Sequence, residues 1–213
     1  MDTDQMKVWK GEFGEKYTER NTYLSSDEHS NSYIARYGKS RDDINNELFS
    51  GISRDLRVLE VGSNIGYQLQ SLHRAGFHKL HGIEIQRHCV DKAKKLWEGI
   101  DIIEASAFDI PFKDNYFDLV FTNNVLIHFS PDDISKVMDE MYRVTNKYIF
   151  GFEYYAENFT EINYRGLGNL LWKADYSRLF QEKHPDLEVV TETFFDCLDD
   201  PGMRDKAYLL KKT

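Results

Sequence analysis

Short apolar runs of strand length alternate with stretches of helical spacing through the middle of the chain. The five runs are residues 57–61, 79–85, 100–104, 117–122 and 147–155. Strands that alternate with helices predict a parallel sheet with right-handed crossovers. Two later runs, 187–195 and 207–210, flank a turn with Pro201 and Gly202, which predicts an antiparallel pair at the sheet edge. We therefore expect an α/β fold with a mostly parallel seven-stranded sheet, helices on both faces and an antiparallel C-terminal strand.

Helical spacing appears before the first strand and between the strands. Residues 4–20, 27–38 and 41–49 predict an N-terminal helical cap. After the fourth strand, Ser130 is expected to cap a helix that starts at Pro131. The apolar stripe of that helix is Ile134, Val137, Met138 and Met141. The helix after the second strand is expected to bury Val90, Ala93 and Leu96 with Trp97.

Charge and cysteine content exclude several classes of protein. The formal net charge is −9, and without a Lys/Arg stripe this does not favour nucleic acid as a partner. The acidic N-terminus lacks a signal-like apolar region, and no apolar run reaches the roughly 18 residues of a membrane span. Cys89 and Cys197 lie far apart, which predicts two reduced core thiols. We expect a cytoplasmic protein without a membrane partner.

The first strand runs into a glycine-rich turn that can hold a ligand. Glu60 ends the strand, and Gly62, Asn64 and Gly66 follow before a helix, so free backbone N–H groups point outward. A tight turn without a ligand has the same pattern. Glu84 ends the second strand, where a carboxylate can accept both hydroxyls of a ribose. Together these features indicate a nucleoside ligand and leave a nicotinamide dinucleotide open.

Two later segments resemble one family closely. Ala-Ser-Ala-Phe-Asp-Ile-Pro-Phe at 105–112 follows the third strand, and Phe-Asp-Leu-Val within 115–128 lies in the fourth. With the glycine-rich turn and Glu84, this pattern resembles the class I S-adenosylmethionine (SAM) dependent methyltransferases over residues 57–155. The flanks 9–21, 125–132, 153–155 and 164–175 resemble the small methyltransferases associated with pseudaminic acid biosynthesis.

The resemblance implies a Rossmann-like methyltransferase fold that binds SAM, releases S-adenosylhomocysteine (SAH) and uses no metal. It places the turn under the methionine, Glu84 at the ribose, residues 106–108 at the adenine and Asn123 near the methionine end. Ser106 departs from the acid that many relatives carry, which puts that contact in doubt. The residues predicted to bind the cofactor are Tyr17, Arg20, Glu60, Gly62, Ser63, Asn64, Glu84, Ile85, Ser106, Ala107, Phe108 and Asn123.

Other candidates have a structural alternative. Tyr17 lies on one helical face with Trp9 and Phe13, which either docks that helix or brings Tyr17 and Arg20 over SAM, with cationic Arg20 suited to its carboxylate. His128 follows the fourth strand and is either a general base or structural. Glu153 is the second candidate base. Arg165 and Lys173 are either anion ligands or solvated charges. The predicted substrate residues are Tyr154, Tyr155, Tyr164, Arg165, Trp172 and Lys173.

We therefore predict one methyltransferase domain, residues 1–213, that methylates an oxygen or nitrogen of an anionic small molecule. Its parts are a cap at 1–50, a SAM-binding core at 51–155, and a substrate loop with closing strands at 156–213. The resemblance suggests a nonulosonic sugar or sugar nucleotide as acceptor. The alternatives are a small-molecule amine, a catalytically silent SAM-binding partner protein and a nicotinamide oxidoreductase. Either a monomer or a homodimer fits.

Overall fold

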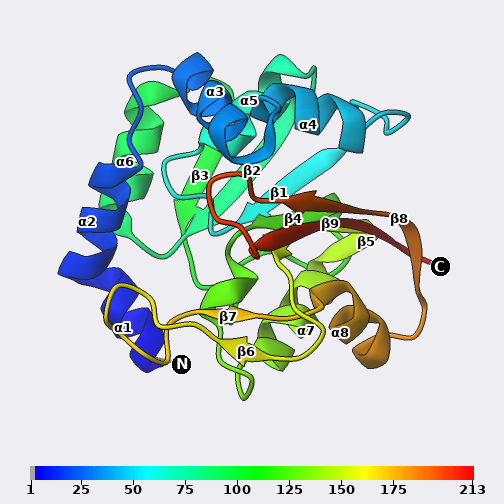
Figure 1. Ribbon diagram of the computed structural model, residues 1–213. Helices are drawn as coiled ribbons and strands as arrows, with labels where there is room; N and C mark the ends of the chain where they lie inside the picture. Colours follow the sequence, from blue (N-terminus) through cyan, green and yellow to red (C-terminus); the bar gives the residue numbers. More distant parts are fainter. Residues whose placement is uncertain (1–2) are drawn as a thin grey trace.

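The computed structural model describes residues 3–213 and contains a seven-stranded sheet in the order β3-β2-β1-β4-β5-β9-β8 (Figure 1). The strands are β1 (Arg57–Val61), β2 (Lys79–Glu84), β3 (Ile100–Glu104), β4 (Phe117–Asn123), β5 (Thr145–Tyr154), β8 (Leu187–Asp196) and β9 (Arg204–Lys212). The first five pair in parallel, and β9 pairs antiparallel with β5 and β8. The predicted sheet is confirmed.

Helices pack on both faces of the sheet (Figure 1). Helices α4 (Arg41–Leu48), α5 (Tyr67–Arg74) and α6 (Arg87–Leu96) form one apolar core with the sheet. Helices α7 (Ile134–Val144) and α8 (Tyr176–Lys183) form the other. Because β1, β2, β4 and β5 pair in parallel, their carboxyl ends meet at one edge of the sheet.

The N-terminal region differs in part from the predicted cap. The stretch 4–20 is two helices, α1 (Asp4–Lys10) and α2 (Glu12–Arg20), because Gly11 between them has an extended backbone. Helix α3 (Ser26–Tyr37) follows. Helix α4 belongs to the core rather than to a cap, since its Ile44 is fully buried together with the following Phe49.

Three further expectations need correction: the cap at Ser130, the helix start at Pro131 and the burial of Leu96. Helix α7 begins at Ile134, not at Pro131, because the hydroxyl of Ser130 donates to the Asp133 carboxylate (3.0 Å) instead of accepting a helix N–H. Leu96 is 46% exposed: α6 ends there, and Trp97 turns inward to donate to the Ile65 carbonyl oxygen (2.6 Å).

The segment after β5 contains elements that the sequence did not predict. Strands β6 (Thr160–Glu161) and β7 (Trp172–Lys173) form a small antiparallel hairpin, and helix α8 follows. The loop of this hairpin lies beside α1 (Figure 1), where the side chain of Gln5 donates to the carbonyl oxygen of Asn169 (3.2 Å). This contact joins the N-terminus to the C-terminal third. Cys89 and Cys197 are both free and buried, as expected.

Candidate functional site

The glycine-rich turn lies at the carboxyl end of β1 and is held to β2. The N–H groups of Gly62 and Ser63 both donate to the carbonyl oxygen of Ile83 (2.9 and 3.0 Å). Gly62 has a φ of +76°, and a Cβ there would lie 2.8 Å from the side chain of Val125. Only glycine fits both constraints, so the turn can approach the loop after β4 closely.

Glu84 is bound to the turn by backbone N–H groups. One carboxylate oxygen accepts from Asn64 N (2.8 Å) and the other from Gln86 N (3.0 Å). Burial raises the pKa of Glu84, and these N–H groups oppose the shift. Asn64 itself has a φ of +48°, a conformation that asparagine tolerates better than most residues. A carboxylate oxygen accepts more than one hydrogen bond, so Glu84 retains acceptor capacity for a ligand hydroxyl.

The loop after β3 is anchored by helix α7. Glu140 accepts from the N–H of Ile110 (2.8 Å), and Arg143 donates to the carbonyl oxygens of Ile110 (2.9 Å) and Phe112 (2.8 Å). These bonds hold the preceding residues 106–108 against the cavity.

One cavity of about 510 Å³ brings most of the candidates together, within the size range of small-molecule sites. The predicted residues that line it are Tyr17, Glu60, Gly62, Ser63, Asn64, Glu84, Ile85, Ser106, Ala107, Phe108, Asn123, His128, Tyr154, Tyr164 and Arg165. The predicted residues outside its lining are Arg20, Glu153, Tyr155, Trp172 and Lys173.

Four of these outside residues lie on other surfaces or in the core. Arg20 is exposed on α2. Tyr155 packs its ring edge-on against Phe194 (4.9 Å between centroids). Trp172 is only 4% exposed, because strand alternation in the short β7 turns it into the core. Lys173, the next residue, is half-buried and also lies outside the cavity lining.

Glu153 lies beneath the loop after β4 rather than in the cavity. It is 1% exposed, and its two oxygens lie 3.0 and 3.3 Å from the donating N–H of Val125. Burial raises the pKa of Glu153 to about 8, against hydrogen bonds from Val125 and the next two N–H groups. A carboxyl group bound in this way supports the loop and is poorly placed to take a proton from a substrate.

Replacing Glu153 by glutamine is expected to destabilise the fold by about 1–3 kcal/mol at pH 5, where the acid is protonated, because both oxygens of the neutral acid can accept from the backbone N–H groups and an amide NH₂ cannot. The wild-type advantage is expected to shrink as the pH rises. A carboxyl group with a raised folded pKa stabilises fully below its unfolded value of 4.5 and loses that contribution towards about 8. Urea unfolding of both proteins at pH 5 and pH 8 measures this; a pH-independent difference contradicts it.

His128 is fixed between an aromatic ring and a backbone carbonyl. Its ring lies 4.4 Å from that of Trp9 and 6.2 Å from that of Tyr164, centroid to centroid. Its Nδ1 is 3.0 Å from the carbonyl oxygen of Leu170. A carbonyl can only accept, so Nδ1 carries the hydrogen and Nε2 keeps the free lone pair. Burial lowers the pKa of His128 to about 4, against this hydrogen bond.

Two buried ionisable side chains near the turn, Arg41 and Glu60, were not recognised together from the sequence. Arg41 is fully buried, and neither of its Nη atoms has a hydrogen-bond partner. Glu60 is 3% exposed, and its Oε2 also has no partner. Burial raises the pKa of Glu60 well above its ordinary value, while the nearby Arg41 opposes the shift. No ion pair within 4.0 Å joins the two side chains, so both retain free hydrogen-bonding capacity. Glu60 lines the cavity, and Arg41 lies directly behind the lining, where it donates to the lining residue Gln68.

The cavity also contains aromatic and cationic groups that sequence reasoning missed. Arg36 lines it, pairs with Asp199 (3.2 Å), and lies 5.6 Å from the ring centroids of Tyr37 and Tyr154. The other aromatic residues missed in the lining are Trp9, Tyr23, His29, Tyr33, Tyr37, Tyr67 and Phe129. Several lie on α3, whose uneven apolar pattern was interpreted only as a cap.

A family model matches the central region of the chain. Residues 59–148 match the family model described as a methyltransferase domain. This region is a methyltransferase domain. The match decides between the two nucleotide ligands that the glycine-rich turn left open, in favour of the methyltransferase prediction. The part of the chain that the structure describes contains no helix long and apolar enough to span a membrane, and within residues 3–213 no acidic, histidine or cysteine cluster is arranged to hold a metal.

The curated relatives differ from this chain in length, and two of them are named for different substrates. An uncharacterised Haemophilus influenzae protein is 28% identical over 57% of this chain and 53% of its own length. The glycine/sarcosine/dimethylglycine N-methyltransferase of Actinopolyspora halophila is 33% identical over 44% of this chain. The phosphoethanolamine N-methyltransferase of Plasmodium falciparum is 23% identical over 72% of this chain and 73% of its own length. The chain thus spans about half of the first relative and 17% of the second.

A solved structure extends the likeness to the whole fold. Magnesium protoporphyrin IX methyltransferase (ChlM) from Synechocystis PCC 6803, determined with bound SAM, has a TM-score of 0.71 at 12% identity and covers 100% of this chain and 99% of its own. The predicted Rossmann-like methyltransferase fold is therefore confirmed.

Proposed function

We propose that the protein is a SAM-dependent methyltransferase that transfers a methyl group to an oxygen or nitrogen of a small anionic acceptor. The observation that carries this proposal is a pair of buried ionisable side chains with unpartnered polar atoms, Arg41 and Glu60, beside the glycine-rich turn. An unpaired charge is costly to bury. A zwitterionic ligand end that reaches between the two side chains would satisfy both.

The amino-acid end of SAM is such a group. Its carboxylate would accept from the Nη atoms of Arg41, and its ammonium would donate to Glu60 Oε2. Arg41 is better suited to the carboxylate than exposed Arg20, because its guanidinium is already desolvated and keeps both Nη groups unoccupied. Glu84 would accept the ribose hydroxyls, and residues 106–108 would border the adenine.

SAM, when bound, supplies a methyl group on a positively charged sulfur. The protein then has to hold an acceptor atom close to that methyl and in line with it, and such positioning contributes about 7–11 kcal/mol to lowering the barrier. A hydroxyl acceptor also has to lose a proton. His128 is neutral because burial keeps its pKa near 4, and its Nε2 lone pair is free to accept that proton.

The aromatic and basic lining supports a small acceptor with a negative group. Arg36 and Arg165 both line the cavity, and Tyr17, Tyr154 and Tyr164 make no protein hydrogen bond through their hydroxyls within residues 3–213. Guanidinium groups suit a carboxylate or phosphate, and phenol hydroxyls suit the hydroxyls of a sugar. A nonulosonic sugar acid or its nucleotide is the specific acceptor that we propose.

An amine acceptor is the second candidate. Tyrosine and tryptophan rings attract cationic amines, and the cavity presents Trp9, Tyr17 and Tyr33. Two of the relatives are named as N-methyltransferases. A protein that binds SAM without catalysis is the third candidate. Isotope-labelled SAM with sugar acids and primary amines separates the three, because only the first two yield labelled products and the products differ.

Calorimetry tests the core of the proposal. We expect SAM and SAH to bind with one site per chain and NADH not to bind. Absence of heat with both SAM and SAH at millimolar concentration would overturn the proposed function.

A further inference from the structure

A chain of hydrogen bonds connects the buried guanidinium of Arg41 with an ion pair nearer the surface. Arg41 Nε donates to Gln68 Oε1 (2.8 Å), and Gln68 Nε2 donates to Asn45 Oδ1 (3.0 Å). Asn45 Nδ2 donates to Ser71 Oγ (2.8 Å), and the Ser71 hydroxyl donates to the carboxylate of Asp42. We call Gln68, Asn45, Ser71 and Asp42 the relay.

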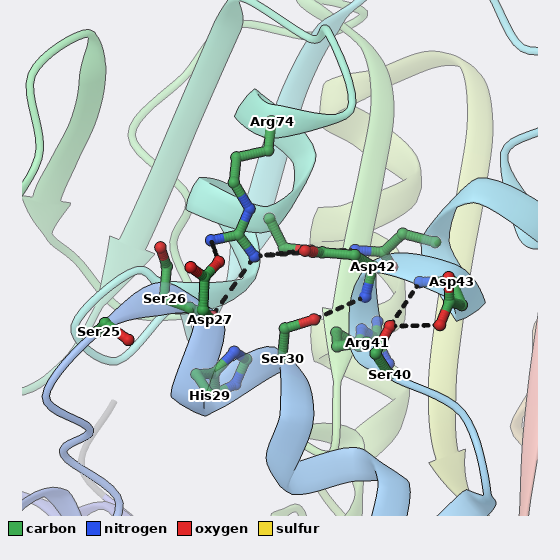
Figure 2. Close-up of polar contacts among 12 residues, drawn as sticks. Ser25, Ser26, Asp27, His29, Ser30, Ser40, Arg41, Asp42, Asp43 and Arg74 are labelled. Atoms are coloured by element: carbon green, nitrogen blue, oxygen red, sulfur yellow. Dashed lines mark hydrogen bonds and ion pairs between the residues drawn. The ribbon is translucent and has the colours of Figure 1, made fainter.

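The outer end of the relay is an ion pair between two helices. Figure 2 shows Arg74 from α5 reaching across to Asp42 at the start of α4, with Nη2 2.6 and 2.8 Å from the two carboxylate oxygens. The N–H of Asp42 donates to the hydroxyl of Ser30 on α3 (3.0 Å). Burial favours the neutral form of Asp42, but hydrogen bonds from Arg74 and Ser71 hold its pKa below the ordinary value. Asp42 is therefore a carboxylate that only accepts.

The two ends of the relay fix the orientation of everything between them. A guanidinium can only donate and a carboxylate can only accept. Each amide in the chain must therefore turn its oxygen towards Arg41 and its NH₂ towards Asp42. Asn45 is fully buried, Ser71 is 1% exposed and Gln68 is 5% exposed, so water does not offer these groups a competing arrangement.

This fixed chain leaves Arg41 with one orientation. Its Nε is engaged by Gln68, and its guanidinium lies 5.2 Å from the ring centroid of Tyr33 and 4.8 Å from that of Phe152. A guanidinium is planar, so fixing Nε between two rings also fixes the directions of both Nη atoms. Gln68 additionally lines the cavity, and its helix α5 begins directly after the glycine-rich turn.

We propose that the relay positions Arg41 for the carboxylate of the cofactor, so that Gln68, Asn45 and Ser71 set the affinity for the amino-acid end of SAM through Arg41. This inference rests on the proposed function. The relay residues are positioning residues, and their substitution changes recognition of the carboxylate but not of the nucleoside.

The substitution Gln68→Glu tests the proposal, because it introduces a charge while keeping the size of the side chain nearly unchanged. A carboxylate at this place would pair with Arg41 Nε inside the protein and compete with the ligand carboxylate. We expect SAH binding to weaken about 10- to 100-fold. Binding of 5′-methylthioadenosine, which lacks the amino-acid end, should stay within twofold. The melting temperature should not fall, because the new carboxylate neutralises an unpaired buried charge.

Two further variants make the result specific. Gln70→Glu introduces the same charge on the same helix, outside the cavity lining, and should leave both ligands unaffected. Ser71→Ala interrupts the relay without adding charge and should weaken SAH about 3- to 10-fold, again without an effect on 5′-methylthioadenosine.

The outcomes separate the relay from the proposed function. If the wild-type protein does not bind SAH, the proposed function is wrong and the relay proposal falls with it. If the wild-type protein binds SAH and Gln68→Glu weakens both ligands equally, or weakens neither, the relay proposal alone is overturned.

Discussion

Replacing Arg41 by methionine is expected to weaken the binding of SAM and SAH by about 10²- to 10³-fold. Removing one partner of a buried charge pair costs about 2–5 kcal/mol of binding energy. Methionine keeps most of the apolar volume of the arginine stem, so the packing between Tyr33 and Phe152 is largely retained. Isothermal calorimetry with SAH measures the loss.

Stability gives this prediction an independent check. Arg41 is fully buried with two unpaired Nη atoms, and removing a poorly compensated buried charge is often neutral or stabilising. We therefore expect the unfolding temperature of Arg41→Met without ligand to equal or exceed that of the wild type. A large fall in this temperature would mean that lost folding, not lost recognition, explains weaker binding.

Arg20→Met is the matched control. The sequence favours Arg20 for the cofactor carboxylate, but Arg20 is exposed on α2, where water already solvates its guanidinium. The structure leads us to expect unchanged SAH affinity in this variant. Strong loss with Arg20→Met and none with Arg41→Met would return the carboxylate to Arg20.

These two arginines show a property that the sequence does not reveal, which is whether a charged side chain is buried or exposed. A sequence read alone places arginine at the surface, since fully buried arginines are rare. Arg41 is buried because Gln68, Tyr33 and Phe152 surround it, and these residues come from α5, α3 and β5. No local pattern encodes that convergence. Arg20 had the right chemistry and a nearby tyrosine, but the helix turns it outward.

The strands and the turn could be predicted because their signals are local. An apolar run such as 57–61 encodes a buried parallel strand by itself, and the positions of Glu60 and Glu84 follow from where two such strands end. The two later segments then specified the family. The short strand β7 has two residues, too few for any periodicity, so the sequence could not reveal that Trp172 and Lys173 lie outside the cavity lining.

Glu153 illustrates a different limit. Its place at the carboxyl end of a central strand is where catalytic residues gather in α/β proteins, and the sequence correctly brings it to that edge. Whether the side chain enters the cavity depends on the loop after β4, whose N–H groups bind the carboxylate from the other side. The residue types of a loop do not reveal where its backbone N–H groups point.

Replacing His128 by glutamine is expected to lower kcat by about 10²- to 10⁴-fold with a hydroxyl acceptor, the range of general base catalysis. SAH affinity should stay nearly unchanged, because the proposed cofactor contacts lie at Arg41, Glu60 and Glu84. With an amine acceptor that enters as the neutral base, kcat should fall much less. Initial rates with labelled SAM at saturating acceptor measure kcat, and His184→Gln is the control, since His184 stacks on Tyr142 outside the cavity lining.

The pH profile tests the same role without a substitution. Burial holds the pKa of His128 at about 4, so its imidazole stays neutral above that value and Nε2 can accept a proton. We expect kcat to be level between about pH 6 and pH 8 and to fall only as the pH drops through about 4. A fall centred near the ordinary histidine value of 6.5 would contradict a buried His128 that is bound to a backbone carbonyl. An unchanged kcat in His128→Gln would instead leave this histidine with the structural role of joining Trp9 to the hairpin loop through Leu170.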